Sequence, residues 1–310
     1  MAGQLRVLRR RIRSVQSTKK ITKAMELIAA SRIVKAQQRV AASQPYAREI
    51  TNVLVALASS STLDHPLLVP RERVRRAGVL VVTSDRGLAG GYNSNVLRNA
   101  EELVSRLRAD NVEPVLYVIG RKGVAYYRFR NRPIEASWTG FSESPTFDDV
   151  REVGELVVQT FLADVDDTVD GQDTDDVHGV DELFIIYTQF VSMVSQKPNV
   201  VRLAPLEVEE EEKPEDVILP AYEYEPEPEK LLEAMLPKYL NARIYAALLE
   251  SAASESAARR QACKSASDNA DDIVKSLTQQ ANRARQAEIT QEISEIVGGS
   301  NALAATGSDD

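Results

Sequence analysis

The most regular pattern of the chain lies in its last quarter. Residues 238–297 contain neither proline nor glycine, while Pro237 precedes them and Gly298 and Gly299 follow. The run consists mainly of good helix formers and predicts one helix about 90 Å long. Small or apolar residues recur along it in steps of three or four, which is typical of a helix that packs on another helix. The predicted packing positions are Ala258, Ala262, Ala266, Asn269, Ile273 and Leu277.

The N-terminal segment, residues 1–60, shows the same kind of pattern. Its apolar residues form two stripes at helical spacing that differ in phase, namely Leu5, Leu8, Ile12 and Val15, then Ile21, Met25 and Ile28. We expect a second long helix, with a kink near Pro45, because proline removes a backbone donor and clashes with the preceding turn. The C-terminal helical segment is taken as residues 228–305. The two predicted long helices therefore lie at the two ends of the chain, with the middle domain between them.

The middle of the chain, residues 75–210, has an α/β pattern. Short apolar, β-branched runs predict buried strands at 78–83, 114–119, 183–188 and 201–208, and helical segments separate them. We expect Asn93 or Ser94 to cap the helix that follows the first strand. Such alternation predicts a doubly wound, Rossmann-like sheet. Because one long helix enters this domain and the other leaves it, the two must form an antiparallel coiled coil if they pack together outside it.

Charge is distributed unevenly along the 310 residues, although the formal net charge is only −8. Residues 1–40 hold eleven Lys or Arg and one acid, Glu26, whereas residues 164–182 hold nine acids and no Lys or Arg. We expect this acidic insertion to be a mobile loop, because it has too little apolar surface to fold alone. The basic start favours an acidic partner, either nucleic acid or a protein surface.

The sequence offers few residues from which a catalytic, phosphate-binding or metal site could be built. The glycine-rich segment at residues 84–95 follows a predicted strand, but its spacing is not that of a phosphate-binding motif, and a tight strand-to-helix turn is the favoured interpretation. Residues 120–123 are interpreted in the same way. Two histidines and one cysteine, Cys263, make no zinc site and no disulfide, and a reducing compartment is favoured. We therefore expect no catalytic set, no cofactor, no secretion signal and no membrane span.

Several motifs resemble the gamma subunit of F-type ATP synthases. They are IRSVQSTKKITKAMELIAASR at 12–32, SDRGLAGGYNSN at 84–95, YEYEPEP at 222–228, ALLESAASESAARRQACKSASDNADD at 247–272 and NRARQAEITQEISEIVGGSNAL at 282–303. The acidic insertion is similar to that of actinobacterial members, including mycobacterial ones. Three positions depart from the usual family pattern, Ala89, Cys263 and Ser267, where cysteine, methionine and threonine are common.

The resemblance implies a non-catalytic central rotor stalk, present in one copy per complex. Its coiled coil would lie inside a hexamer of alpha and beta subunits, and its base would rest on the epsilon subunit and the c-ring. The complex would be the chain's only link to the membrane, at the cytoplasmic face. The implied contacts with the beta-subunit catch loops are Lys23, Met25, Arg285 and Gln286, and those with the c-ring or epsilon are Tyr222, Glu223 and Tyr224.

A nucleotide- or nucleic-acid-binding α/β protein with a coiled-coil dimerisation arm is the alternative. The basic N-terminal helix would then be a nucleic-acid arm, but its first aromatic residue is Tyr46, so aromatic side chains do not alternate with its charges. An apolar stripe shares the same helix, which favours a solvated face of a coiled coil or a basic face against an acidic protein.

Overall fold

The computed structural model describes residues 2–60, 71, 73–163, 168–169, 172–173, 179–206 and 228–306. These form two compact units. One contains Met1–Ile28 with Arg260–Asp310, and the other contains Ala29–Arg259. Two long helices, α1 (Ala2–Ser60) and α5 (Pro228–Thr306), contribute residues to both units. No described helix is long and apolar enough to cross a membrane.

A five-stranded sheet forms the centre of the Ala29–Arg259 unit. Its strand order is β3-β2-β1-β6-β7, in which the first four strands are parallel and β7 is antiparallel to β6. The strands are β1 (Arg76–Val82), β2 (Glu113–Ile119), β3 (Ala136–Trp138), β6 (Glu182–Phe190) and β7 (Gln196–Ala204). The sheet and the long helices confirm the predicted mixed α/β architecture.

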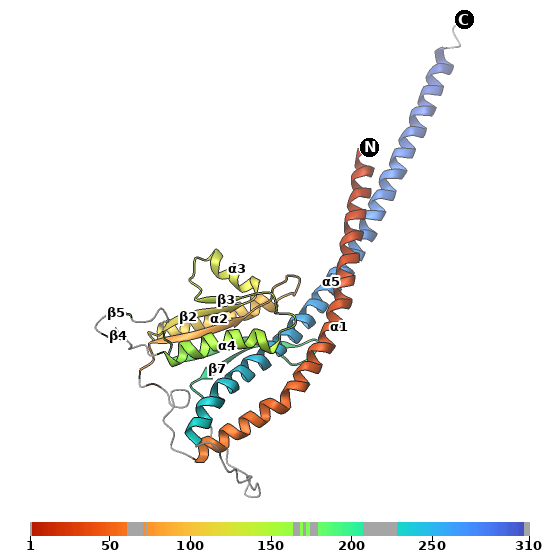
Figure 1. The fold of residues 1–310 in the computed structure, drawn as a ribbon. Helices are drawn as coiled ribbons and strands as arrows, with labels where there is room; N and C mark the ends of the chain where they lie inside the picture. The colour runs from red at the N-terminus through yellow and green to blue at the C-terminus, as the bar shows by residue number, and fades with distance from the viewer. Residues whose placement is uncertain are drawn as a thin grey trace. The chain divides into compact units, whose positions relative to one another are not determined.

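Both faces of the sheet are covered (Figure 1). Val79 and Val81 of β1 pack with α2 (Tyr92–Ala109) and α3 (Arg121–Phe129). Leu80 and Val82 point to the other face, where α4 (Phe147–Leu162) and the first part of α5 lie with a short stretch of α1. Because successive side chains of a strand alternate between faces, a continuous apolar run is required of a strand buried on both sides.

The observed elements differ from the predicted ones at several boundaries. Helix α1 is continuous across Pro45, and α5 runs through Pro237 and through the two glycines at 298–299, so neither that proline nor the glycine pair ends it. Buried leucines on either side of Pro237, Leu236 and Leu240, anchor that turn to the core and offset the lost backbone bond. Strand β7 begins at Gln196 and includes Pro198, which an edge strand tolerates.

In the unit of Met1–Ile28 and Arg260–Asp310, the two helices are antiparallel. Lys19 Nζ lies 2.5 Å from Asp271 Oδ1, and the hydroxyls of Thr22 and Ser267 lie 2.7 Å apart. The residue numbers therefore rise along α1 as they fall along α5.

The buried stripe of α5 in this unit lies beside the predicted one. Its buried residues are Cys263, Ser267, Ala270 and Ala281. Of the predicted packing positions, Ala262, Ala266 and Leu277 are half-buried, and Ile273 is 48% exposed. Ala258, in the other unit, is also half-buried. A shift of one position rotates the face of a helix by about 100°, and a sequence rich in alanine and serine on every side does not select one face.

The predicted acidic insertion, residues 164–182, is described only in part. A pair of two-residue antiparallel strands, β4 (Thr168–Val169) and β5 (Gln172–Asp173), forms within it. Its last residue, Glu182, is the first residue of β6, and Asp181 before it is held by the sheet. Asp181 is 2% exposed, accepts hydrogen bonds from the backbone N–H groups of Arg75 and Arg76, and pairs with Arg71 at 3.2 Å.

Candidate functional site at the carboxyl edge of the sheet

Open parallel sheets bind ligands at the carboxyl ends of their strands, where neighbouring connections diverge. In this sheet that point follows β1, which lies between β2 and β6. The loop at residues 83–91 leaves β1 here and leads into α2, and residue 120 leads from β2 into α3. A bound phosphate would lie at the N-terminus of one of these helices.

The protein's own groups occupy the N-terminus of α3. The Asp85 carboxylate accepts hydrogen bonds from the backbone N–H groups of Arg121 at 3.1 Å, Gly140 at 2.8 Å and Ser142 at 3.1 Å. The next N–H groups of α3 also donate to the β1 loop, from Lys122 to the Ser84 carbonyl and from Gly123 to the Thr83 hydroxyl. A carboxylate of the chain therefore takes the place that a phosphate oxygen would take in a nucleotide-binding protein.

The glycines of this region permit close packing. Gly120 has φ +95°, and a Cβ there would lie 2.2 Å from the Thr83 carbonyl oxygen. A Cβ on Gly123 would lie 2.7 Å from Val118 Cγ1. These contacts agree with the interpretation of the glycine-rich segments as tight strand-to-helix turns. The predicted cap is wrong, because Gly91 is the N-cap of α2 and the Asn93 side chain instead accepts a hydrogen bond from the Ser84 N–H.

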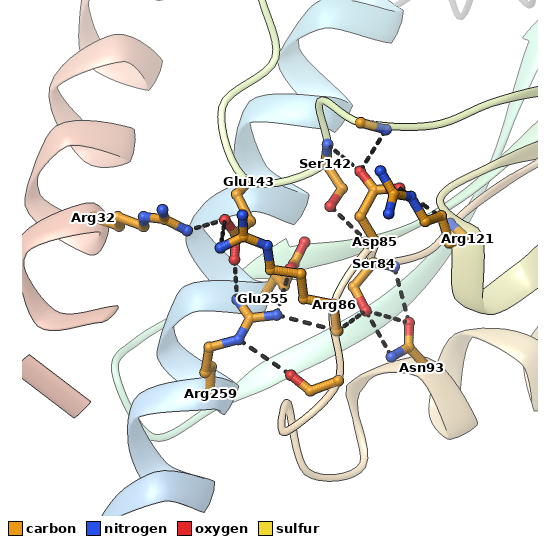
Figure 2. A network of polar contacts seen from close by, with 12 residues as sticks. Arg32, Ser84, Asp85, Arg86, Asn93, Arg121, Ser142, Glu143, Glu255 and Arg259 are labelled. Carbon is orange, nitrogen blue, oxygen red and sulfur yellow. Dashed lines mark hydrogen bonds and ion pairs between the residues drawn. The ribbon is translucent and has the colours of Figure 1, made fainter. Parts of the chain in front are cut away.

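A second set of charged residues joins this loop to both long helices (Figure 2). Glu143, between β3 and α4, forms ion pairs with Arg32 of α1, with Arg86 of the β1–α2 loop at 3.5 Å, and with Arg259 of α5 at 3.0 Å. We call Arg32, Arg86, Glu143, Glu255 and Arg259 the Glu143 cluster.

Arg259 is the most deeply buried cation of the Glu143 cluster, with 4% of its surface exposed. It donates to Glu255 Oε1 at 2.7 Å and to the backbone carbonyls of Arg86 and Gly87 at 3.2 and 3.3 Å. Burial raises the pKa of Glu255, while the charge of Arg259 acts in the opposite direction. The pair is a buried charge pair, in which each partner depends on the other because an unpaired charge is very unfavourable in the interior.

This arrangement is suited to holding segments together. Each acid of the Glu143 cluster is paired with arginine, and Asp85 is bonded to three N–H groups, so none is presented as a free acid or base. Within the described parts of the chain, no group of three or more His, Cys, Asp or Glu side chains is placed to hold a metal ion. Sequence reasoning missed the cluster, although Glu255 and Arg259 are four residues apart among small residues, and that spacing was its one available signal.

None of the predicted catch-loop residues belongs to this network, since they lie in the unit of Met1–Ile28 and Arg260–Asp310. Lys23 is exposed and pairs with Glu26 at 3.0 Å, and Met25 is half-buried. Arg285 and Gln286 are exposed on α5, in the same unit as Lys23 and Met25. Tyr222, Glu223 and Tyr224 lie outside the described residues.

The fold and this network define an α/β protein with long terminal helices. A family model described as ATP synthase matches residues 4–303. The chain is 65% identical over 309 residues to the ATP synthase gamma chain of Salinispora arenicola, with 100% of both chains covered. It is 60% identical over 306 residues to that of Mycolicibacterium smegmatis, with 99% of this chain and 100% of the relative covered. The chain belongs to the family of ATP synthase gamma chains.

Solved structures show the same fold at low sequence identity. A chain in the OSCP/F1/c-ring structure of the Euglena gracilis mitochondrial ATP synthase matches with a TM-score of 0.68 at 18% identity, covering 100% of this chain and 98% of that chain. A chain of the rotor structure of the same enzyme matches with a TM-score of 0.66 at 16% identity, covering 93% of this chain and 100% of that chain.

Proposed function

We propose that this chain is the central rotor stalk of a proton-translocating ATP synthase, present in one copy per complex. The observation that carries the proposal is the 65% identity to a gamma chain across all of both sequences. Rotation of the c-ring would turn the stalk, and the asymmetric shaft would drive each beta subunit of the alpha/beta hexamer through its nucleotide-binding states. Catalysis takes place in the beta subunits, and this chain supplies coupling.

Exposed apolar side chains on α5 support a shaft that is enclosed by other subunits. Ile289, Ile293 and Ile296 are 47%, 56% and 71% exposed and recur at steps of four and three. Exposed apolar residues that share one helical face are typical of a contact surface. Lys23, Met25, Arg285 and Gln286 are the residues that we expect at the beta-subunit catch loops.

The base would bear on the epsilon subunit and the c-ring through Tyr222, Glu223 and Tyr224. The chain would then be a peripheral subunit on the cytoplasmic face of the membrane, attached through the complex. This contact rests on the family motif at residues 222–228.

Reconstitution with purified subunits tests the proposal. The chain is mixed with alpha and beta subunits, or separately with duplex DNA at two salt concentrations, and complexes are separated by sedimentation. We expect cosedimentation with alpha and beta and ATP hydrolysis by the assembled complex. Strong DNA binding that weakens steeply with salt, without binding to alpha and beta, would favour the nucleic-acid alternative.

A further inference from the structure

Three arginines from separate parts of the chain converge on one carboxylate. Arg32 lies 111 residues before Glu143 in the sequence, and Arg86 and Arg259 come from the β1–α2 loop and from α5. The Glu143 side chain is 14% exposed and that of Arg259 is 5% exposed. Ion pairs with arginine are directional, because the planar guanidinium fixes the angle as well as the distance of each bond.

The small side chains at residues 251–257 of α5 do little by themselves to fix the rotation of the helix about its own axis. Residues 251–257 are buried at every position and consist of alanine, serine and one glutamate. Small side chains let neighbouring segments approach closely but interlock poorly, and apolar burial is non-directional. Large side chains earlier in α5, among them Leu240 and Ile244, anchor the helix in the core. At residues 251–259, polar contacts at defined angles add to that anchoring.

The loop that carries Glu143 is itself fastened to the sheet. Asp85, just after the end of β1, accepts hydrogen bonds from the N–H groups of Gly140 and Ser142. In return, the backbone N–H of Asp85 donates to the Ser142 hydroxyl oxygen at 2.9 Å. A continuous set of polar contacts thus connects β1 to the loop at residues 139–146 and, through Glu143, to Arg32 and Arg259.

We propose that Glu143 is a positioning residue that keeps α1 and α5 in a fixed rotational register with the sheet, so that torque applied to the base reaches the shaft helices. The inference rests on the proposed function. Arg259 is the last residue of the Ala29–Arg259 unit and Arg32 is its fourth, so the cluster acts where both helices leave that unit.

The test uses the assembled ATP synthase in inverted membrane vesicles. ATP hydrolysis and ATP-driven proton pumping are measured in the same vesicles, and the ratio of pumping to hydrolysis is normalised to the amount of assembled complex. We expect Glu143→Gln to retain hydrolysis and to lower this ratio by about three- to tenfold, because the neutral amide weakens the charge-assisted contacts with Arg32, Arg86 and Arg259. Glu152→Gln, which changes an exposed side chain of α4, is the control and leaves the ratio unchanged.

A double-mutant comparison identifies the partner. If Glu143 acts through Arg32, the double variant Glu143→Gln/Arg32→Gln loses no more coupling than Glu143→Gln alone. Glu143→Asp, which keeps the charge but shortens its reach, covers the case in which Glu143→Gln does not assemble. An unchanged ratio per assembled complex in either Glu143 variant overturns the proposal, because a purely structural role changes the amount of complex but not its coupling.

Vesicles reconstituted without this chain separate the two proposals. If ATP-driven pumping persists without the chain, the proposed function fails. If pumping requires the chain but the Glu143 variants couple normally, only the role of Glu143 fails.

Discussion

At the scale of single residues, burial acts against the charge of Glu250 on α5. Glu250 is half-buried, and this burial raises the pKa of its carboxyl, while a hydrogen bond from the Phe190 backbone N–H opposes the rise. A carboxyl whose pKa is higher in the folded chain than in the unfolded chain destabilises the fold wherever it is ionised. Its charge is therefore a cost at neutral pH.

We expect Glu250→Gln to raise the melting temperature of the full chain at neutral pH. The wild-type contribution of Glu250 is most favourable below the unfolded pKa, about 4.3, and declines as the pH rises through the folded pKa. The difference in melting temperature should therefore grow from acid to neutral pH in calorimetry. Glu152→Gln on the exposed face of α4 serves as the control. A difference that does not change with pH would contradict the assignment.

At the scale of elements, α4 and α5 cross closely at Gly154. A Cβ on this glycine would lie 1.7 Å from Asn241 Oδ1 and 2.8 Å from its Cγ, so a larger residue requires the Asn241 side chain to move. Alanine is favoured over glycine inside a helix by about 1 kcal/mol, whereas overpacking a core costs about 1–3 kcal/mol. The second effect dominates here.

Gly154→Ala should therefore lower the free energy of unfolding, measured with urea. Gly298→Ala is the matched control, because it lies within α5 and a Cβ there would meet nothing within 4 Å. We expect the control to leave stability unchanged or to raise it. Equal effects of the two substitutions would show that the crossing can open without loss.

A second prediction at the scale of elements concerns which face of α5 packs against α1. Ser267 is 4% exposed and its hydroxyl contacts that of Thr22, whereas Ala266 is half-buried. Ser267→Leu should separate the helices at a cost of about 1–3 kcal/mol, and Ala266→Leu should cost less. The loss of stability in each variant is measured by hydrogen exchange of the α1 amides before residue 28. The reverse order would restore the face predicted from Ala262 and Ala266.

At the scale of the whole molecule, the proposed contact with the beta-subunit catch loops depends on Arg285, which is exposed on α5. Arginine can make two parallel bonds to a carboxylate or to backbone oxygens, which an exposed position near a catch loop would use. We expect Arg285→Ala to lower ATP synthesis more than assembly. Arg283→Ala, an exposed neighbour on another side of the helix, is the control. Normal synthesis by an assembled Arg285→Ala enzyme would contradict the proposed contact.

Periodicity predicted the elements well where the pattern was long or strongly apolar. The strands at β1, β2 and β6 were found within a few residues, because buried parallel strands are continuous apolar runs. The three-residue β3 was missed, since so short a strand has no periodicity to detect. The antiparallel start of β7 was missed because Gln196 and Lys197 carry no apolar signal, and their pairing depends on β6.

The sequence by itself determined the two long helices, the α/β order between them and the membership of the gamma chain family, since each rests on local pattern or on motifs that are contiguous in the chain. Only the tertiary structure decided which face of α5 is buried and that Arg32, Arg86 and Arg259 meet at Glu143. Charged residues far apart in the sequence have no common period, so their pairing appears only when the sheet brings their segments together.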